Sequence, residues 1–325
     1  MKIKKSTKNN IITYCLMIVL FATVTVMVQT GNASRHMQSM LVPICINIIL
    51  AVSLNLTIGI LGDLSLGHAG FMSVGAYSGC LFSIFTKDML PSAVRFPLSM
   101  LVGAIVAALF GALIGTAVLR LNGDYLAIVT LAFGEIIRSV IINLGFTGGA
   151  AGLKGTPQDS TFTVAFVMVM ITLIVILNLI YSKHGRAFMA LRDNSIAAEA
   201  CGLSIKRYKL IAFVISAAFA GIAGVIYGHN LSILTAGTFD YNMSIEILVM
   251  VVLGGIGSIR GSVISAIVIT VLPEALRFMK DYRMLIYALV LITVMIFNSS
   301  EKTSQLKAKL ARTFKKGRKE VAANE

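Results

Sequence analysis

Charged residues are scarce in this chain, and their scarcity excludes most classes of soluble protein. Asp, Glu, Lys and Arg make up 13% of the 325 residues, whereas 57% are hydrophobic, and the mean hydropathy is +0.88. A helix that crosses the hydrocarbon core of a bilayer needs about 20 predominantly apolar residues. The composition therefore indicates an integral membrane protein with material for roughly ten spans and no separate soluble domain.

Residue types that carry metal or redox chemistry are few and widely separated. The cysteines are Cys15, Cys45, Cys80 and Cys201, and the histidines are His36, His68, His184 and His229. No CxxC or Cys/His ligand spacing occurs among them. We therefore interpret the cysteines as small packing residues and expect no metal site.

The sequence also lacks a nucleotide-binding or catalytic constellation. The segment GGAAGLKGT at 148–156 is rich in glycine and contains a lysine. However, it lacks the GK[ST] order of a phosphate-binding loop and follows no predicted strand. We therefore expect this chain to bind no cofactor and to have no ATPase motif of its own, so that it is not an enzyme. Energy for any active process would come from another polypeptide or from an ion gradient.

Apolar runs that break at charged or glycine-rich points predict an all-α bundle of about ten transmembrane helices. The first run is longer than the roughly 7 to 15 apolar residues of a signal peptide, so we expect an uncleaved first span. The predicted spans lie near residues 11–29, 40–59, 66–86, 96–119, 124–144, 161–181, 208–228, 243–258, 261–279 and 284–298.

The formal net charge of +14 lies mainly in the tails and in alternate loops. This distribution is explained better by membrane orientation and lipid headgroups than by nucleic-acid binding. With the N-terminus inside the cell, 20 of the 28 Lys and Arg residues fall on the cytoplasmic side, in agreement with the positive-inside rule. We predict cytoplasmic basic tails at 1–10 and 299–325 around a transmembrane domain at 11–298, in a bacterial-type plasma membrane.

Small residues recur at helical spacing where helices are expected to pack closely. In the predicted span at 96–119 they fall every four positions from Gly103 to Gly115, a pattern that permits tight contact between helices. The stretches at 59–75 and 253–265 are alternatively interpreted as broken or re-entrant helices. Because each lies between two spans, these stretches are also candidate matching points of an internal repeat.

A polar segment, RAFMALRDNSIAAEACGLSIKRYK at 186–209, interrupts the apolar runs. Asp193, Asn194 and Ser195 are typical of helix starts, and Gly202 is placed to end a short helix. The sequence thus predicts a two-turn surface helix between two spans. The basic residues on either side of this helix favour a cytoplasmic position.

Part of this polar segment and three other segments together carry a resemblance to a known family. They are LNLTIGILGDLSLGHAGF at 54–71, RLNGDYLAIVTLAFGEIIR at 120–138, IAAEACGLSIKRYKLIAF at 196–213 and SIEILVMVVLGGIGSIRG at 244–261. In this order they resemble ABC importer permeases, and more specifically the LivM-type permeases of branched-chain amino acid importers. The resemblance implies that a cytoplasmic coupling loop at about 182–207 contacts a partner ATPase. The contact residues that it implies are Arg192, Asp193, Glu199, Ala200 and Gly202.

Polar and ionisable residues within the predicted spans are candidates for a translocation path or gate. Glu135 and Arg138 lie three residues apart near the middle of a span, so we expect them to pair with each other. His68 is interpreted as a packed structural histidine, with a role in gating as the alternative. Asn55 and Glu246 are expected to face the bundle interior. The glycine candidates in the second glycine-rich stretch are Gly254, Gly255 and Gly257.

The resemblance implies a permease subunit that passes branched-chain or related hydrophobic amino acids into the cell while separate subunits use ATP. Its implied partners are a paralogous second permease, two ATP-binding subunits, an extracytoplasmic substrate-binding protein and membrane lipids. We expect no nucleic-acid partner. Three alternatives remain open, namely an ABC permease for urea or amides, an ion-gradient-driven secondary transporter, and a membrane anchor without transport activity. A gradient-driven carrier would be expected to have more acidic residues in its spans than Glu135 and Glu246.

Overall fold

The structure is a computed structural model that describes residues 23, 35–121, 123–276, 288–289 and 292. The chain divides into two compact units, residues 1–270 and 271–325. Apart from residue 23, the predicted first span lies outside the described residues, as do the predicted tails and most of the predicted last span. In the second unit, the described residues are the helical end at 271–276 and the helical positions 288, 289 and 292.

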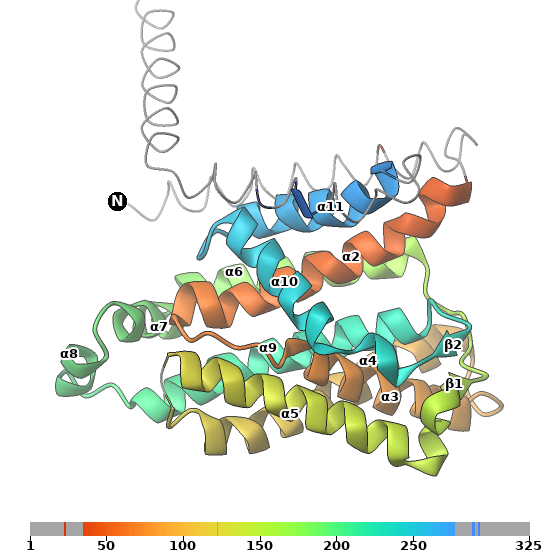
Figure 1. Cartoon of the computed structure of the whole chain (residues 1–325), viewed down its shortest axis with the longest axis horizontal. Coiled ribbons are helices and arrows are strands. Elements are labelled where there is room, and N and C mark those ends of the chain that lie inside the picture. The colour runs from red at the N-terminus through yellow and green to blue at the C-terminus, as the bar shows by residue number, and fades with distance from the viewer. Residues whose placement is uncertain (1–22, 24–34, 122, 277–287, 290–291, 293–325) are drawn as a thin grey trace, which may run out of the picture. The chain divides into compact units, whose positions relative to one another are not determined.

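The described part of the first unit consists of helices with one pair of short strands (Figure 1). The longer helices are α2 (Arg35–Asn55), α3 (His68–Phe85), α4 (Ser92–Val118), α5 (Asp124–Asn143), α6 (Phe162–Tyr181), α9 (Ile205–Gly228), α10 (Tyr241–Gly254) and α11 (Ile259–Ala275), which continues into the second unit. The shorter elements are the π-helix η1 (Leu56–Leu61), the 3-10 turns η2 (Gly145–Thr147), η3 (Gly149–Ala151) and η4 (Ala236–Thr238), the helices α7 (Lys183–Asp193) and α8 (Ser195–Ala200), and the strands β1 (Leu153–Lys154) and β2 (Ile233–Leu234).

The predicted all-α membrane fold is confirmed. Within the described residues, five helices are long and apolar enough to cross a membrane, namely Met37–Leu61, Ser92–Val118, Asp124–Asn143, Phe162–Tyr181 and Ile205–Gly228. Each corresponds to a span predicted from the sequence, because long apolar runs bounded by polar residues are a strong signal.

One predicted span needs correction. We expected a crossing at 243–258, but α10 has only 14 residues, which at about 1.5 Å per residue is about 21 Å, shorter than the hydrocarbon core of about 30 Å. The helix ends where Gly255 and Gly257 take left-handed φ values of +92° and +83°. The glycine-rich stretch at 253–265 is therefore a helix break, as the alternative interpretation proposed. The stretch at 59–75 comprises the end of η1, a connection at 62–67 that lies outside any helix, and the start of α3.

The core is a direct contact between the backbones of α3, α4 and α9. A Cβ at Gly75 in α3 would overlap the backbone of Gly221 in α9, and a Cβ at Gly221 would in turn overlap the Gly103 carbonyl in α4. Glycine at these positions allows the helices to approach closely. The small-residue pattern in α4 therefore does mark a helix contact, as predicted.

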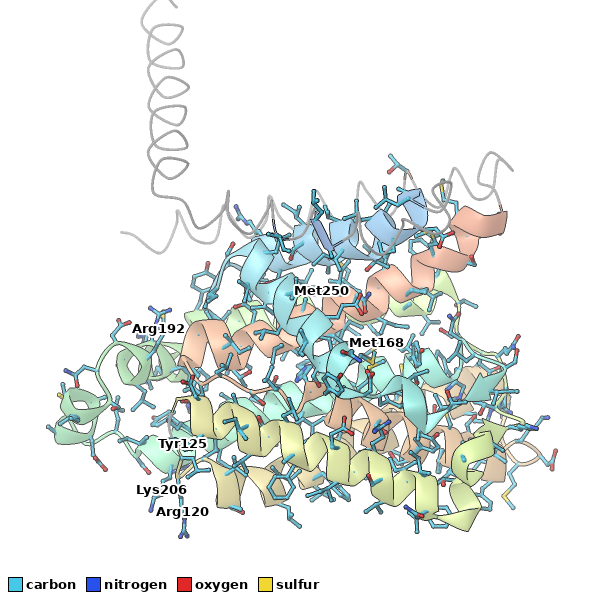
Figure 2. The ribbon with its side chains drawn as sticks, in the orientation of Figure 1. Arg120, Tyr125, Met168, Arg192, Lys206 and Met250 are labelled. Carbon is cyan, nitrogen blue, oxygen red and sulfur yellow. The ribbon has the colours of Figure 1, made fainter. Side chains whose placement is uncertain are left out.

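The first unit has two different ends (Figure 1). At one end, β1 pairs antiparallel with β2, and Arg95 at the start of α4 forms an ion pair of 2.5 Å with Asp159. At the other end lie α7 and α8, together with Arg120, Arg192 and Lys206 (Figure 2). Three basic residues that the sequence assigned to one side of the membrane are thus found at the same end of the unit, the α7–α8 end.

Candidate coupling site and translocation path

The polar loop between α6 and α9 is more helical than the sequence predicted. An 11-residue helix, α7, precedes the expected short helix. Ser182 caps its N-terminus, because the Ser182 hydroxyl accepts hydrogen bonds from the backbone N–H groups of His184 and Gly185. Phe188 and Leu191 are buried and attach one face of α7 to the unit. Asp193 is consequently the last residue of α7, not part of the start of the following helix as we expected.

The predicted short helix is present as α8. The Asn194 side chain caps it by accepting a hydrogen bond of 3.0 Å from the Ala197 N–H, and Gly202 follows the helix with a left-handed φ of +86°. The Gly202 N–H donates to the Glu199 carbonyl at 2.9 Å. Both ends of α8 are therefore fixed by the residues that the sequence indicated.

The outer face of α8 is exposed. Ile196 is 80% exposed, and Glu199, Ala200 and Gly202 are also exposed. Ala198 is buried and holds the opposite face against the unit. An exposed isoleucine beside a carboxylate on a helix with fixed ends is a surface that another protein can contact.

Arg192 is directed toward the unit instead of lying wholly on the exposed face. Its Nη1 donates a hydrogen bond of 2.9 Å to the Gly59 carbonyl in η1, while Nε and Nη2 donate to Asp193 Oδ1 at 3.1 and 3.0 Å. The guanidinium group therefore connects α7 to the first glycine-rich stretch.

The two glycine-rich stretches, which lie far apart in the sequence, meet at this point. Asn55 Oδ1 accepts a hydrogen bond of 2.9 Å from the Gly257 N–H, and Asn55 Nδ2 donates to Ser262 Oγ at 2.8 Å. Gly254 also packs directly against the Gly261 backbone. Two predicted path candidates, Asn55 and Gly257, are thus hydrogen-bonded to each other beside Arg192, and the candidates Gly254 and Gly255 lie in the adjoining helix end and turn. Asn55 is fully buried and uses both ends of its amide group.

A buried ion pair that the sequence did not indicate lies close to this junction. Lys209 Nζ is 2.7 Å from Asp63 Oδ1, and the two side chains are only 9% and 13% exposed. Burial raises the pKa of the Asp63 carboxyl, whereas the nearby Lys209 ammonium acts in the opposite direction. The pair attaches the connection between η1 and α3 to the start of α9. No sequence signal joins these residues, because they are 146 positions apart in the chain and lie in two separate segments.

His68 occupies a structural position. It is buried, and its Nε2 lies 2.9 Å from Ser53 Oγ. Ser216 in α9 donates to the Ser53 carbonyl at 2.6 Å, so this cluster joins α2, α3 and α9. The geometry agrees with the interpretation of His68 as a packed histidine with a satisfied hydrogen bond.

Glu135 and Arg138 form the predicted pair on α5. Arg138 Nε and Nη2 lie 2.9 and 2.8 Å from Glu135 Oε2, and the two side chains are 29% and 30% exposed. Ser139 and Asn143 continue the same face of the helix, and Glu135, Ser139 and Asn143 line a shallow groove along it. A partly exposed polar stripe within a spanning helix requires water or another protein beside it.

Glu246 does not face the interior of the bundle as expected. Its side chain is exposed on the wall of a cavity of about 320 Å³ between α2, α9 and α10. Asn47, Asp240 and Asn242 also line this cavity. The reason is that α10, which runs obliquely (Figure 1), is separated here from α2 and α9 by this cavity, so Glu246 faces open space between helices and not a packed helix contact.

The fold and these sites define a class of protein, a multi-pass α-helical membrane protein with a capped helix projecting at one end. Over residues 36–297 the sequence matches the family described as branched-chain amino acid transport system / permease component. The chain therefore belongs to this family.

Individual relatives agree with the family match. The chain is 34% identical over 260 residues to the high-affinity branched-chain amino acid transport system permease protein LivM of Escherichia coli, covering 69% of this chain and 60% of that relative. It is 33% identical, with the same coverage, to the protein of the same name in Salmonella typhimurium. A probable branched-chain amino acid transport permease protein LivM of Methanocaldococcus jannaschii is 26% identical over 203 residues, 56% of this chain and 59% of that relative. The chain thus spans about three fifths of the length of the relatives it matches.

Proposed function

We propose that this chain is the permease subunit of an ATP-binding-cassette importer that moves branched-chain or related hydrophobic amino acids into the cell. The observation that carries the proposal is α8, an exposed helix with both ends capped, on a spanning unit that belongs to the permease family. The chain supplies the path, and separate subunits bind and hydrolyse ATP, so it has no enzymatic activity of its own. A permease for urea or amides is the nearest alternative.

The proposed path follows the polar features that the membrane-spanning helices expose. Glu135 and Arg138 on α5 face outward from this chain, so a second, paralogous permease subunit would enclose the path on that side. Glu246 lines a polar cavity whose carboxylates suit the ammonium group of an amino acid. Helices α3, α4 and α9, which contact one another through glycine, form the packed core of the unit and support these polar positions on α5 and α10.

We assign the remaining partners to the two ends of the unit. At the α7–α8 end, two ATP-binding subunits contact the permease pair, one at each α8 helix. At the β1–β2 end, an extracytoplasmic binding protein docks near the loop at 148–156. The exposed apolar side chains along α4, such as Leu101, Ile105 and Leu109, contact membrane lipids.

This assignment fixes an orientation that the native cysteines can test. Cys201 is exposed at the end of α8, whereas Cys45 and Cys80 are buried. In a Cys15→Ser background, a membrane-impermeant maleimide is expected to label Cys201 in inside-out vesicles but not in intact cells. Lys154→Cys, at an exposed position in β1, serves as the opposite control when Cys201→Ser is added. Labelling of Cys201 in intact cells would reverse the orientation and remove α8 from the cytoplasm.

Transport itself is tested by uptake of labelled leucine, urea and an aromatic amino acid in cells that lack the endogenous gene and carry this chain with its partner subunits. We expect leucine uptake that depends on ATP and survives an ionophore that collapses ion gradients. Uptake abolished by the ionophore would indicate a gradient-driven carrier. Uptake of urea without leucine would indicate the urea permease, and no uptake of either would contradict the proposal.

A further inference from the structure

The Arg192 side chain supplies a hydrogen bond that the end of η1 lacks. The helix ends at Leu61, so carbonyl groups in its last turn have no donor within the helix. Arg192 Nη1 donates to one of them, the Gly59 carbonyl, at 2.9 Å. A charged donor makes a stronger hydrogen bond than a neutral one, and this donor comes from α7.

The space that Arg192 occupies exists because Gly62 has no side chain, and the close approach of Gly257 to Gly59 beside it likewise depends on glycine. A Cβ at Gly62, where φ is +89°, would lie 2.6 Å from Arg192 Cγ. A Cβ at Gly257 would lie 3.2 Å from the Gly59 carbonyl oxygen and 3.8 Å from Arg192 Nη1. Any side chain at Gly62 would displace Arg192 from the Gly59 carbonyl.

The contact continues from η1 into the second half of the chain. Asn55, directly before η1, accepts from the Gly257 N–H and donates to Ser262 Oγ in the first turns of α11. Arg192 and Asn55 together therefore join α7, the end of α2, the turn after α10 and the start of α11. Asp193 is the other partner of Arg192 and belongs to α7 itself.

We propose that Arg192 is a positioning residue that transmits displacement of α7 and α8 to the two glycine-rich breaks, and that it is not a contact residue for the ATPase. The proposal rests on the proposed function and assigns the internal connection within the same site. Movement of α8 then shifts the ends of α2, α10 and α11 together, because one guanidinium and one amide group hold these ends in register.

The decisive variant is Arg192→Met, which keeps a long side chain but removes the donor. In vesicles with the assembled complex, we expect the number of leucine molecules moved per ATP hydrolysed to fall about tenfold, because loss of a charge-assisted hydrogen bond disconnects the two parts. Arg186→Met removes the same charge from an exposed position on α7 and is expected to stay within about twofold of wild type. Arg192→Lys retains a donor and is expected to recover most of the ratio.

A purely structural role would lower uptake and ATP hydrolysis together, in proportion to the amount of assembled complex, and leave their ratio unchanged. An unchanged ratio for Arg192→Met would therefore overturn the proposal. Gly62→Ala offers an independent route, since it displaces Arg192 without altering any charge. Its control is the Arg192→Met, Gly62→Ala double variant, in which Gly62→Ala is expected to cause no further fall because the Arg192 contact is already lost. A further fall in the double variant equal to that of Gly62→Ala alone would assign the defect to backbone strain and contradict the proposal.

A measurement that does not depend on transport separates this inference from the proposed function. Amide hydrogen exchange of the full chain in lipid nanodiscs is expected to be about tenfold faster at residues 56–63 and 255–262 in Arg192→Met, and unchanged in Arg186→Met. If wild-type vesicles take up no leucine, the proposed function fails while the exchange result still decides the role of Arg192. Unchanged exchange in both segments would overturn the connection whatever the substrate is.

Discussion

Vesicles that contain the Gly202→Val or the Glu199→Lys variant are expected to lose ATP-dependent leucine uptake, by about tenfold or more, while the permease remains inserted and abundant. Gly202 has a φ of +86°, a conformation that a β-branched residue resists, so valine would alter the end of α8. A Cβ at Gly202 meets nothing within 4 Å, and the effect therefore arises from the backbone and not from a clash. Glu199→Lys reverses an exposed charge on the face that we propose contacts the ATPase.

The measurement is uptake together with ATP hydrolysis stimulated by the binding protein, at matched amounts of permease. Both quantities are expected to fall in parallel, unlike the altered ratio expected for Arg192→Met. Gly202→Asn is the matched control, because asparagine tolerates the left-handed φ of +86° at the same position, and it is expected to keep most of both activities. Wild-type values for both α8 variants would refute a coupling role for this helix.

The second large effect is expected at Glu135 and Arg138. Each single substitution to alanine leaves one charge unpaired within a spanning helix, whereas the double substitution removes both charges. We expect the double variant to be more stable than the summed effects of the single variants predict, with a coupling free energy of about 1 to 2 kcal/mol. Thermal denaturation of the purified chain in detergent measures this cycle. If the destabilisation of the double variant equals the sum of the two single variants, the ion pair contributes no energy to stability.

A role of the pair in transport is tested separately by exchanging the two charges. In the Glu135→Arg, Arg138→Glu variant the ion pair can re-form, so stability is expected to approach that of wild type. Uptake is expected to stay low, because the order of charge along the proposed path is reversed. Recovery of both stability and uptake would assign the pair to helix structure alone.

Most of the fold could be predicted because its signals are local. Long apolar runs located the spanning helices, and small residues at a spacing of four located the contact face of α4. The ends of α8 were predictable for the same reason, since Asn194 and Gly202 act on their immediate neighbours in the chain. The Glu135 and Arg138 pair is also local, being one helical turn apart.

The features that sequence reasoning missed depend on partners distant in the chain. The inward direction of Arg192 depends on the Gly59 carbonyl, and the position of Lys209 depends on Asp63, so neither contact leaves a local pattern. The helix α7 was missed because its buried face contains few apolar side chains, Phe188 and Leu191 among them, within an otherwise basic segment. The exposure of Glu246 follows from the cavity between α10, α2 and α9, which an apolar run does not reveal.

The backbone contact of α3, α4 and α9 also constrains how the protein is made. The residues Gly75 and Gly103 belong to helices that contact each other, since a Cβ at Gly103 would lie 2.9 Å from the Gly75 carbonyl oxygen. Gly221 of α9, which packs against both helices, is synthesised only after the whole middle of the chain. Until then the glycine faces of α3 and α4 lack their permanent neighbour and are covered by something else. Assembly in the membrane thus depends on whatever covers these faces during translation giving way when α9 is inserted.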